Sequence, residues 1–440
     1  HDSIVSMEAA LIGMIPEGLY LLTTVALAAS TMRLAKRGVL LHNMKSIESL
    51  ARVDVLCVDK TGTITENTME VQELVPVVSI ENDGTDLTNV EKLIGDFCRT
   101  MSADNDTMKA MKEFFVTNNQ REAVSYTSFS SVEKFSSVTF PEATYILGAP
   151  EMILRDNYEM YQSEVEHYTS QGYRLLVFGK YLGEFQETLA AEVQPLGYIL
   201  LWNPIRKEAK ATFEYFAEQN VAIKVISGDN PLTVSNVAQA AGIIGAENYV
   251  DARTLTTMEA QTEALEKYTV FGRVTPEQKK QFVLLLKKLD HTVAMTGDGV
   301  NDILAMKEAD CSIAMASGNQ ATAQASQVVL LDSDFSTMPE VVFEGRQVVN
   351  NIERSSSLFL VKNIFSLLMS VFAMIFAVTY PLQPTQVTLI SLFTIGIPST
   401  FLALEPNHRR IEGKFLFNVL SKAIPGGLTD MLVVGALRIC

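Results

Sequence analysis

The chain has 440 residues, 48% of them hydrophobic, and a formal net charge of −16. Its mean hydropathy of +0.16 is too high for an ordinary soluble enzyme of two or three domains, so membrane-spanning segments are expected. The acidic balance argues against nucleic-acid binding, and four cysteines without a CxxC pair indicate a reducing cytosolic setting and argue against a thiolate metal site.

The first apolar segment, residues 9–30, carries a single charge and is followed directly by three basic residues. This pattern predicts a membrane helix that leaves the bilayer on the cytoplasmic side. Pro16 has no N–H group, so it should interrupt the helix and leave nearby carbonyl groups without helical partners. Such carbonyls are costly in lipid unless a cation or water uses them, and Glu17 lies beside them. A proline kink with a protonated Glu17 facing a crevice is the alternative.

A hydrophobic run, VDVLCV, ends abruptly in Asp59, which is followed by Thr61, Gly62 and Thr63. The Val-rich run predicts a strand that is buried on both faces of a parallel sheet. Ligands bind at the carboxyl ends of such strands, where a Thr-Gly-Thr turn presents N–H groups and hydroxyls to an anion. Because a lone Asp after a strand is more often a simple cap, this site needs support from elsewhere in the chain.

The same arrangement occurs twice more. The strand-like run AIKVI precedes Ser227, Gly228 and Asp229, and the run HTVAM precedes a tight loop that contains Asp298 and Asp302. Three strand-end loops with carboxylates, small hydroxyls and glycines can build one site for Mg²⁺ and a phosphoryl group.

The signatures DKTGT at 59–63 and TGDGVND at 296–302 stand in the order found in P-type ion-transporting ATPases. The chain resembles this family over essentially its whole length, and the nearest subgroup is the calcium-pump-like bacterial cation ATPases. The resemblance implies an α/β fold with a haloacid-dehalogenase-like doubly wound parallel sheet, an inserted α/β nucleotide-binding domain and transmembrane α-helices. It also implies that the actuator domain and the first membrane helices lie outside this chain, which is then a fragment of a longer pump.

The resemblance sets the expected domain organisation. A helix rising from GRQVVNNIERS beneath the phosphorylation domain is expected to couple that domain to the membrane. The expected location is the bacterial plasma membrane, with the large domains in the cytoplasm. The expected limits are a transmembrane helix with the PEGL break at 1–34, the phosphorylation domain at 35–67 and 204–350, the nucleotide-binding domain at 68–203, and transmembrane helices within 351–440, at about 356–379, 385–404 and 423–440.

The resemblance also assigns roles at the phosphorylation site. Asp59 would attack the γ-phosphoryl group of ATP and form an aspartyl phosphate. Mg²⁺ would be held by Asp59, the Thr61 carbonyl and Asp298, while Asp302 would position Asp298. The residues expected to neutralise or orient the phosphate are Lys279, Ser227, Gly228, Asp229, Thr61 and Asn301.

Soluble phosphatases of the haloacid dehalogenase superfamily share this core and are the obvious competitor. They generally place a second Asp two residues after the nucleophile, as the general acid and base for hydrolysis. Here that position is Thr61, so the acyl phosphate should persist, as a pump cycle requires.

A nucleotide pocket is expected from weaker resemblances. KFSSVTF is similar to the family's adenine-contacting stretch, which makes Phe135 the ring that stacks on the base, although a Phe in a strand is usually core. YILGAPEMIL is similar to a stretch in which the family has Lys in place of Leu147, and Gly148 would still line the pocket. Arg174 is expected to contact phosphate, and Arg206 is expected to contact the nucleotide.

In the family, PEGL is the ion-binding break of the first span, and two later spans add ligands. Each polar residue there, taken alone, is more often a helix-packing residue. Ser366 and Ile395 stand where calcium pumps carry acidic residues, so one divalent ion, or another cation, is expected. Calcium export is the first expectation; the alternatives are Mg²⁺, K⁺ or H⁺ transport, a lipid flippase, and a catalytically weakened regulatory relic. The expected ligands of the transported cation are Ile12, Gly13, Ile15, Glu17, Asn363, Ser391 and Thr394.

Overall fold

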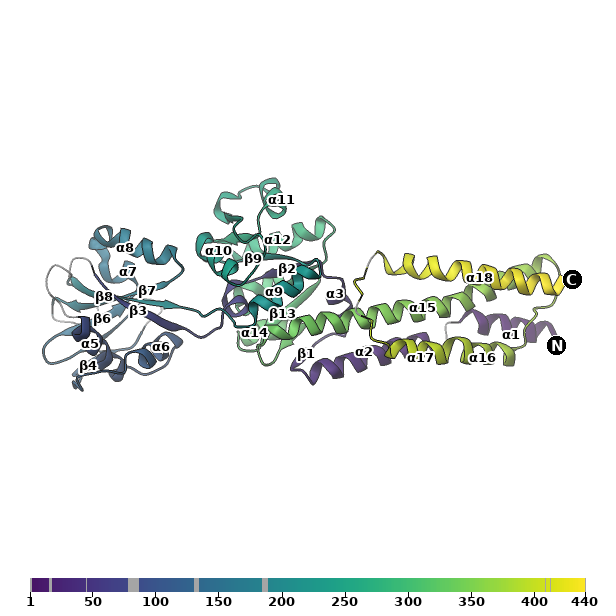
Figure 1. Cartoon of the computed structure of the whole chain (residues 1–440), viewed down its shortest axis with the longest axis horizontal. Helices are drawn as coiled ribbons and strands as arrows, with labels where there is room; N and C mark the ends of the chain where they lie inside the picture. The colour runs from purple at the N-terminus through teal and green to yellow at the C-terminus, as the bar shows by residue number, and fades with distance from the viewer. Residues whose placement is uncertain are drawn as a thin grey trace.

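In a computed structural model, the chain forms two sheet-containing parts and a set of long helices. A six-stranded sheet lies at one end, an eight-stranded sheet in the middle, and the helices at the other end, where both termini lie (Figure 1). The expected combination of a doubly wound sheet, an α/β insert and membrane-type helices is confirmed. The structure describes residues 2–15, 18–44, 46–77, 87–129, 134–183, 189–407, 409–411 and 413–439.

The larger sheet has the strand order β1-β14-β13-β12-β2-β9-β11-β10. All neighbours pair in parallel except β1 with β14, and helices cover both faces (Figure 1). The central strands β2, β12 and β13 are buried along their whole length, which explains their continuous apolar sequences. The strands are β1 (Val39–Leu41), β2 (Val55–Val58), β9 (Ala222–Ile226), β10 (Tyr249–Asp251), β11 (Val270–Gly272), β12 (Val293–Gly297), β13 (Cys311–Met315) and β14 (Val328–Leu330).

Two hydrophobic cores lie on opposite faces of this sheet. Leu56 and Val58 of β2 belong to one core, and Val55 and Cys57 belong to the other, as the period-two alternation of a strand requires. The covering helices are α3 (Ser46–Arg52), α9 (Ala209–Glu218), α10 (Pro231–Ala240), α11 (Met258–Lys267), α12 (Pro276–Lys288), α13 (Ile303–Glu308) and α14 (Gln320–Ala325).

The smaller sheet is antiparallel throughout, in the order β3-β8-β7-β6-β5-β4. It is inserted between β2 and β9 of the larger sheet, and the two crossing segments pair where Thr65 meets Ile205. Its elements are β3 (Glu70–Pro76), α5 (Leu87–Thr100), α6 (Asp106–Phe114), β4 (Ser125–Thr127), β5 (Phe135–Thr139), β6 (Thr144–Gly148), α7 (Pro150–Leu154), α8 (Tyr158–Ser170), β7 (Arg174–Tyr181) and β8 (Val193–Trp202).

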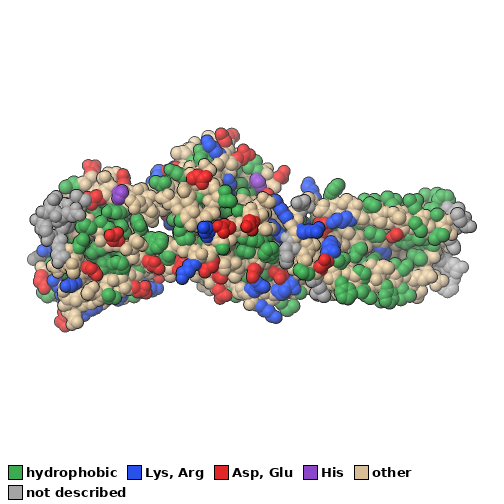
Figure 2. Space-filling model, in the orientation of Figure 1, with side chains coloured by type: hydrophobic (Ala, Val, Ile, Leu, Met, Phe, Trp, Pro, Cys, Tyr) green, Lys and Arg blue, Asp and Glu red, His purple; other side chains and the backbone are tan. Residues whose placement is uncertain are grey.

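Among the residues that the structure describes, four helical segments are long and apolar enough to cross a membrane. Hydrophobic side chains cover this end of the molecule, while Lys and Arg gather where the helices meet the middle part (Figure 2). The segments are Met7–Ala35, Phe335–Ile375, Pro384–Ala403 and Phe415–Leu437. The helices in them are α1 (Asp2–Met14), α2 (Leu19–Ala35), α15 (Met338–Ile375), α16 (Pro384–Ile390), a π-helical turn (Ser391–Gly396), α17 (Ile397–Leu404) and α18 (Phe415–Ile439).

The last helix begins earlier than its apolar sequence suggests. The expected start is near 423, whereas α18 begins at Phe415 because its polar first turns pack against α15. There Lys422 pairs with Glu353 at 2.8 Å, and Asn418 donates to the same carboxylate at 3.2 Å. This tertiary contact is invisible to a search for apolar runs.

Helix α15 runs without a break from beneath the larger sheet into the helical end (Figure 1). It packs closely on α3, since a Cβ atom at Gly345 would lie 2.8 Å from the Ile47 carbonyl oxygen. Glu344 also accepts hydrogen bonds from Arg33 at 2.8 Å and Ser30 at 3.1 Å, which tie α15 to α2. A single rigid helix therefore joins the sheet to the membrane-type segments.

Candidate functional site

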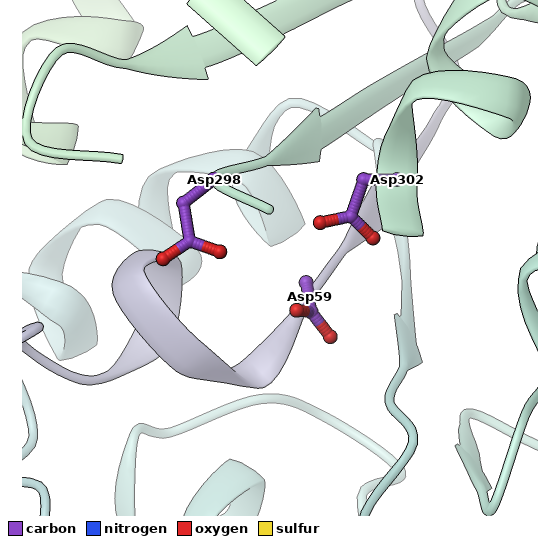
Figure 3. Close-up of side chains that lie close together, drawn as sticks. All are labelled: Asp59, Asp298 and Asp302. Atoms are coloured by element: carbon purple, nitrogen blue, oxygen red, sulfur yellow. The ribbon is translucent and has the colours of Figure 1, made fainter. Parts of the chain in front are cut away.

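Three loops meet at one edge of the larger sheet. Strands β12, β2 and β9 are neighbours and run in parallel, so their carboxyl ends lie side by side. Asp298 follows β12, Asp59 follows β2, and Ser227 follows β9. The carboxylates of Asp59, Asp298 and Asp302 point toward one another (Figure 3). This is the edge at which open α/β sheets bind their ligands.

A buried lysine joins two of the three carboxylates. Lys279 Nζ lies 3.1 Å from Asp59 Oδ1 and 2.7 Å from Asp302 Oδ1. Helix α12 presents this lysine from its first turns, which are fixed by a Thr275 capping box. The Gly299 N–H donates to Asp302 Oδ2 at 3.3 Å, so Asp302 is held from two sides. The lysine thus has two partners, while Asp298 faces the cluster without it.

The cluster carries more negative than positive charge, and the pKa values of its carboxyl groups reflect this. Burial, followed by the charge of Asp302, raises the pKa of Asp59 to about 6, although Lys279 opposes the shift. Burial and Asp302 also raise the pKa of Asp298. Burial lowers the pKa of Lys279, but Asp59 and Asp302 outweigh it, so the net pKa lies above its ordinary value.

These residues fit a divalent metal ion. One oxygen from each of Asp59, Asp298 and Asp302 lies within 4.8 Å of the others, a spacing at which a single ion can bind. Lys279 offsets one of the three charges, so the cluster has a net charge that a cation would neutralise. Asp302 is 1% exposed, whereas Asp59 and Asp298 are only partly buried, which leaves Asp59 and Asp298 as the better ligands.

The turn after Asp59 needs a glycine. Gly62 adopts a φ of +73°, and a Cβ atom there would lie 2.1 Å from Asp298 Oδ2. The buried hydroxyl of Thr63 meets that of Thr296 on β12 at 3.3 Å. Arg206 Nη2 donates to the Gly62 carbonyl at 2.8 Å. The geometry therefore gives Arg206 a contact with the turn, where the sequence analysis expected a contact with nucleotide.

Asp229 is expected to orient phosphate, but its carboxylate forms an ion pair with Lys60. Lys60, the residue that follows Asp59, is only 9% exposed in spite of its charge. Ser227 is buried, and its hydroxyl accepts the Asp229 N–H at 3.3 Å. The Lys60 pair thus fastens the loop after β9 to the loop after β2.

A cleft of about 890 Å³ lies between the two sheet-containing parts. Thr233 of α10 donates to the Thr169 carbonyl of α8 at 3.2 Å across its border. The expected site residues that line it are Thr61, Gly148, Arg174 and Asp229, and Leu147 lines it as well. Asn301 is exposed in the short turn Val300–Asp302.

The expectation that the Phe135 ring stacks on a base is not met in this structure. Phe135 is 4% exposed and packs in the core beneath α7 and α8, with Ile146 and Ile153. The next residue along β5, Ser136, lines the cleft instead. Side chains along a strand point alternately to the two faces of the sheet. Because Phe135 and Ser136 are neighbours, the Ser136 side chain faces the cleft and the Phe135 ring faces the core on the other side.

The expected cation ligands of the first span lie around the break between α1 and α2. Ile12 O accepts the Ile15 N–H at 3.4 Å, and Ile15 O accepts a hydrogen bond from Lys362 Nζ at 3.3 Å. Both carbonyl groups therefore have a partner, whereas the sequence predicted that they would have none. Pro16 and Glu17, on which the kink and the carboxylate ligand depend, lie outside the described residues.

Two of the three expected ligands from the later spans approach this break. With its amide turned so that nitrogen donates, Asn363 reaches the Gly13 carbonyl at 3.2 Å. Ser391 Oγ lies 3.3 Å from Lys362 Nζ. Thr394 does not join them, because its side chain is exposed and donates to the Ile390 carbonyl of its own helix at 2.6 Å.

Lys362 was not among the residues expected near the helix break. A lysine within an apolar span is itself a signal, because a charge there is costly unless it has a partner. The residue precedes Asn363 on α15 and is 7% exposed.

Comparisons with known proteins agree with this architecture. A family model described as haloacid dehalogenase-like hydrolase matches residues 53–310. The chain is 39% identical over 439 residues to "Probable cation-transporting ATPase exp7" of Streptococcus pneumoniae, a match that covers 97% of this chain and 55% of that protein. It is 40% identical over 445 residues to "Calcium-transporting ATPase CtpE" of Mycolicibacterium smegmatis, with 97% of this chain and 54% of that protein covered.

Among solved structures, a crystal structure of a zinc-transporting PIB-type ATPase in the E2.Pi state has a TM-score of 0.63 and 20% identity, covering 88% of this chain and 55% of that one. At this identity the likeness shows a shared fold alone. The chain spans about half the length of the curated relatives it matches, and its expected resemblance to cation-transporting ATPases is confirmed. Because the family model covers more than half of the sequence, the chain belongs to the haloacid dehalogenase-like hydrolase family.

Proposed function

We propose that this chain is the catalytic part, and a portion of the membrane pathway, of an ATP-driven cation transporter that works through an aspartyl phosphate at Asp59. The observation that carries the proposal is the carboxylate cluster at the carboxyl ends of parallel strands, with Lys279 bonded to Asp59 at 3.1 Å. Thr61 stands where a phosphatase of this superfamily would place its acid, so hydrolysis of the intermediate is not assisted there.

The proposed phosphoryl transfer assigns one role to each residue of the cluster. A carboxylate oxygen of Asp59 attacks the γ-phosphorus of ATP, the bond to the bridging oxygen breaks, and ADP leaves with that electron pair. Lys279 lies close enough to neutralise charge that moves onto the transferred group. Mg²⁺, held by Asp59, the Thr61 carbonyl and Asp298, would supply further charge neutralisation when bound.

The cleft between the two sheet-containing parts is the proposed ATP site. Arg174 and Thr61 both line it, so one cleft reaches from the smaller sheet to the turn after Asp59. Leu147 at this cleft leaves it without the positive charge that the resembling family has there. Arg174 is then the proposed phosphate contact from the smaller sheet.

The transported ion is proposed to be Ca²⁺, through a membrane that we propose is the bacterial plasma membrane. Support comes from the relative in Mycolicibacterium smegmatis, whose printed name is calcium-transporting ATPase, and from the polar residues Asn363 and Ser391 near the helix break. Transport of Mg²⁺, K⁺ or H⁺ uses the same phosphorylation chemistry and is the second candidate.

Replacing Asp59 by Asn should reduce phosphoenzyme to background, because an amide cannot attack phosphorus. The measurement is acid-stable, hydroxylamine-sensitive labelling by radioactive ATP in membrane vesicles, titrated with Ca²⁺ at fixed Mg²⁺. Asp290→Asn, an exposed site in the same domain, is the matched control and should label like the wild type. Labelling that survives in Asp59→Asn contradicts the nucleophile assignment, and no labelling in the wild type favours a weakened relic.

Gly62→Ala should lower both stability and phosphoenzyme level. The positive φ costs roughly 1–3 kcal/mol for a residue with a Cβ atom, and that atom would also displace the Asp298 carboxylate. Gly242→Ala is the control, because its φ of +78° is matched but its nearest neighbour is a flexible lysine chain. Equal phosphoenzyme levels in the two variants would show that the Asp298 contact is unimportant.

Mg²⁺ should stabilise the wild type more than Asp59→Asn, as measured by the shift in melting temperature on adding the ion. Without the ion, the Asp59 pKa of about 6 lies above its ordinary 3.8, so the charged carboxylate destabilises the fold above pH 6. This destabilisation disappears as the pH falls from 6 toward 3.8, because Asp59 is protonated at a higher pH in the folded protein than in the unfolded chain. Asp59→Asn should therefore melt higher than the wild type above pH 6, and the difference should shrink below it.

The control for this measurement is again Asp290→Asn, which should respond to Mg²⁺ and to pH as the wild type does. An equal response to Mg²⁺ in Asp59→Asn and the wild type would remove Asp59 from the proposed metal site.

A further inference from the structure

Helix α15 packs against α17 and the π-helical turn before it, and hydrogen bonds join them at two places. Asn351 of α15 donates to the Ala403 carbonyl at 3.3 Å and to the Glu405 carbonyl at 2.8 Å. Further along α15, Lys362 lies 3.3 Å from Ser391 Oγ. Residue numbers rise on one side as they fall on the other, so the two helices run antiparallel. We call the facing stretch between these two contacts the α15–α17 seam; it lies toward the larger sheet (Figure 1).

Three buried side-chain oxygen atoms of this seam have no hydrogen-bond partner among the described residues: Asn351 Oδ1, Ser355 Oγ and Ser399 Oγ. Each of the three residues is 1% exposed. Ser355 follows Asn351 by four residues, about one helical turn, and therefore lies on the same face of α15. Ser399 precedes Ala403 by the same spacing on α17. Because the helices are antiparallel, both serines lie one turn beyond the Asn351 contact, in the same part of the seam.

The Asn351 amide cannot be turned over to give its oxygen a partner. Its nitrogen donates to two carbonyl oxygens, and exchanging nitrogen and oxygen would bring three acceptors together. The orientation of the amide is therefore fixed by α17 and by the residue after it. Oδ1 is left with lone pairs that no described group uses.

The two serine hydroxyls differ from their neighbours on the same helices. Ser357 of α15 and Thr400 of α17 each donate to the carbonyl four residues earlier, both at 2.9 Å. This is the usual bond of a hydroxyl within a helix. Neither Ser355 nor Ser399 makes it. Since buried hydroxyl groups rarely stay without a partner, these two oxygen atoms indicate a ligand in the seam.

The chemistry of the three oxygen atoms favours a cation with a single charge. Amide and hydroxyl oxygens are neutral ligands with lone pairs, of the kind that hard cations bind. The two nearby carboxylates do not add charge, because Glu353 pairs with Lys422 and Glu405 pairs with Arg354. The seam also approaches the C-terminal end of α17, where the last carbonyl groups of a helix favour positive charge. A neutral set of oxygens compensates one charge better than two.

We propose that the α15–α17 seam binds an alkali cation, K⁺ or Na⁺, through Asn351 Oδ1, Ser355 Oγ and Ser399 Oγ, with water molecules completing the coordination. This site is separate from the proposed site of the transported cation at the helix break, and it does not depend on the proposed transport function. The bound ion fastens α17 to α15, the helix that extends beneath the larger sheet.

The test measures the melting temperature of the membrane-inserted protein, without ATP and at fixed Ca²⁺, as K⁺ or Na⁺ replaces N-methyl-D-glucamine at constant ionic strength. Ser355→Ala and Ser399→Ala each remove one proposed ligand with little change in volume. Ser357→Ala is the matched control, because it removes a buried hydroxyl of α15 that already has a partner, the Glu353 carbonyl.

The wild type should gain stability with K⁺ or Na⁺ up to saturation, as a ligand that binds only the folded state requires. Each of Ser355→Ala and Ser399→Ala should need about tenfold more ion for the same shift, and Ser357→Ala should respond like the wild type. An equal response to K⁺, Na⁺ and N-methyl-D-glucamine means that the oxygens hold only water and overturns the proposal. A saturable response that is unchanged in both ligand variants, or equally weakened in Ser357→Ala, also overturns it.

Discussion

The structure of the site depends on the balance between three clustered carboxylates and one buried lysine. Lys279 bridges Asp59 and Asp302 from a helix packed on the sheet, so the loops after β2 and β12 cannot separate without breaking an ion pair. Removing Lys279 would leave the buried carboxylates uncompensated, and the loss of such a partner costs about 3–5 kcal/mol. The remaining negative charge makes the same cluster a ready receptor for a cation.

At the helical end, the buried Lys362 donates to the Ile15 carbonyl at 3.3 Å and to the Ser391 hydroxyl at 3.3 Å. Helix α15 carries this lysine and also begins beneath the larger sheet, where Gly345 allows it to pack against α3. A shift of the sheet would therefore move the helix that carries Lys362, which gives a physical route for coupling between the two ends.

Much of the fold and of the candidate site could be predicted from the sequence, because each part is encoded locally. Buried strands show continuous apolar runs, and their ends show carboxylates and glycines, so Asp59, Asp298 and Asp302 could be placed at one edge. What could not be predicted depends on contacts between distant segments. Examples are the ion pair between Lys60 and Asp229, the burial of the Phe135 ring in the core, and the hydrogen bonds of Lys362. Each depends on how distant strands and helices are aligned, which no local sequence pattern contains.

The most direct test of the central claim is to identify the phosphorylated side chain itself. Borohydride reduces an acyl phosphate of aspartate to homoserine, so the protein is treated with ATP and Mg²⁺, reduced, digested and sequenced by mass spectrometry. The account predicts homoserine at position 59, in the peptide that contains CVDKTGTIT, and only when ATP is present. Homoserine at Asp298 or Asp302 instead, or no homoserine in a protein that hydrolyses ATP, would contradict it.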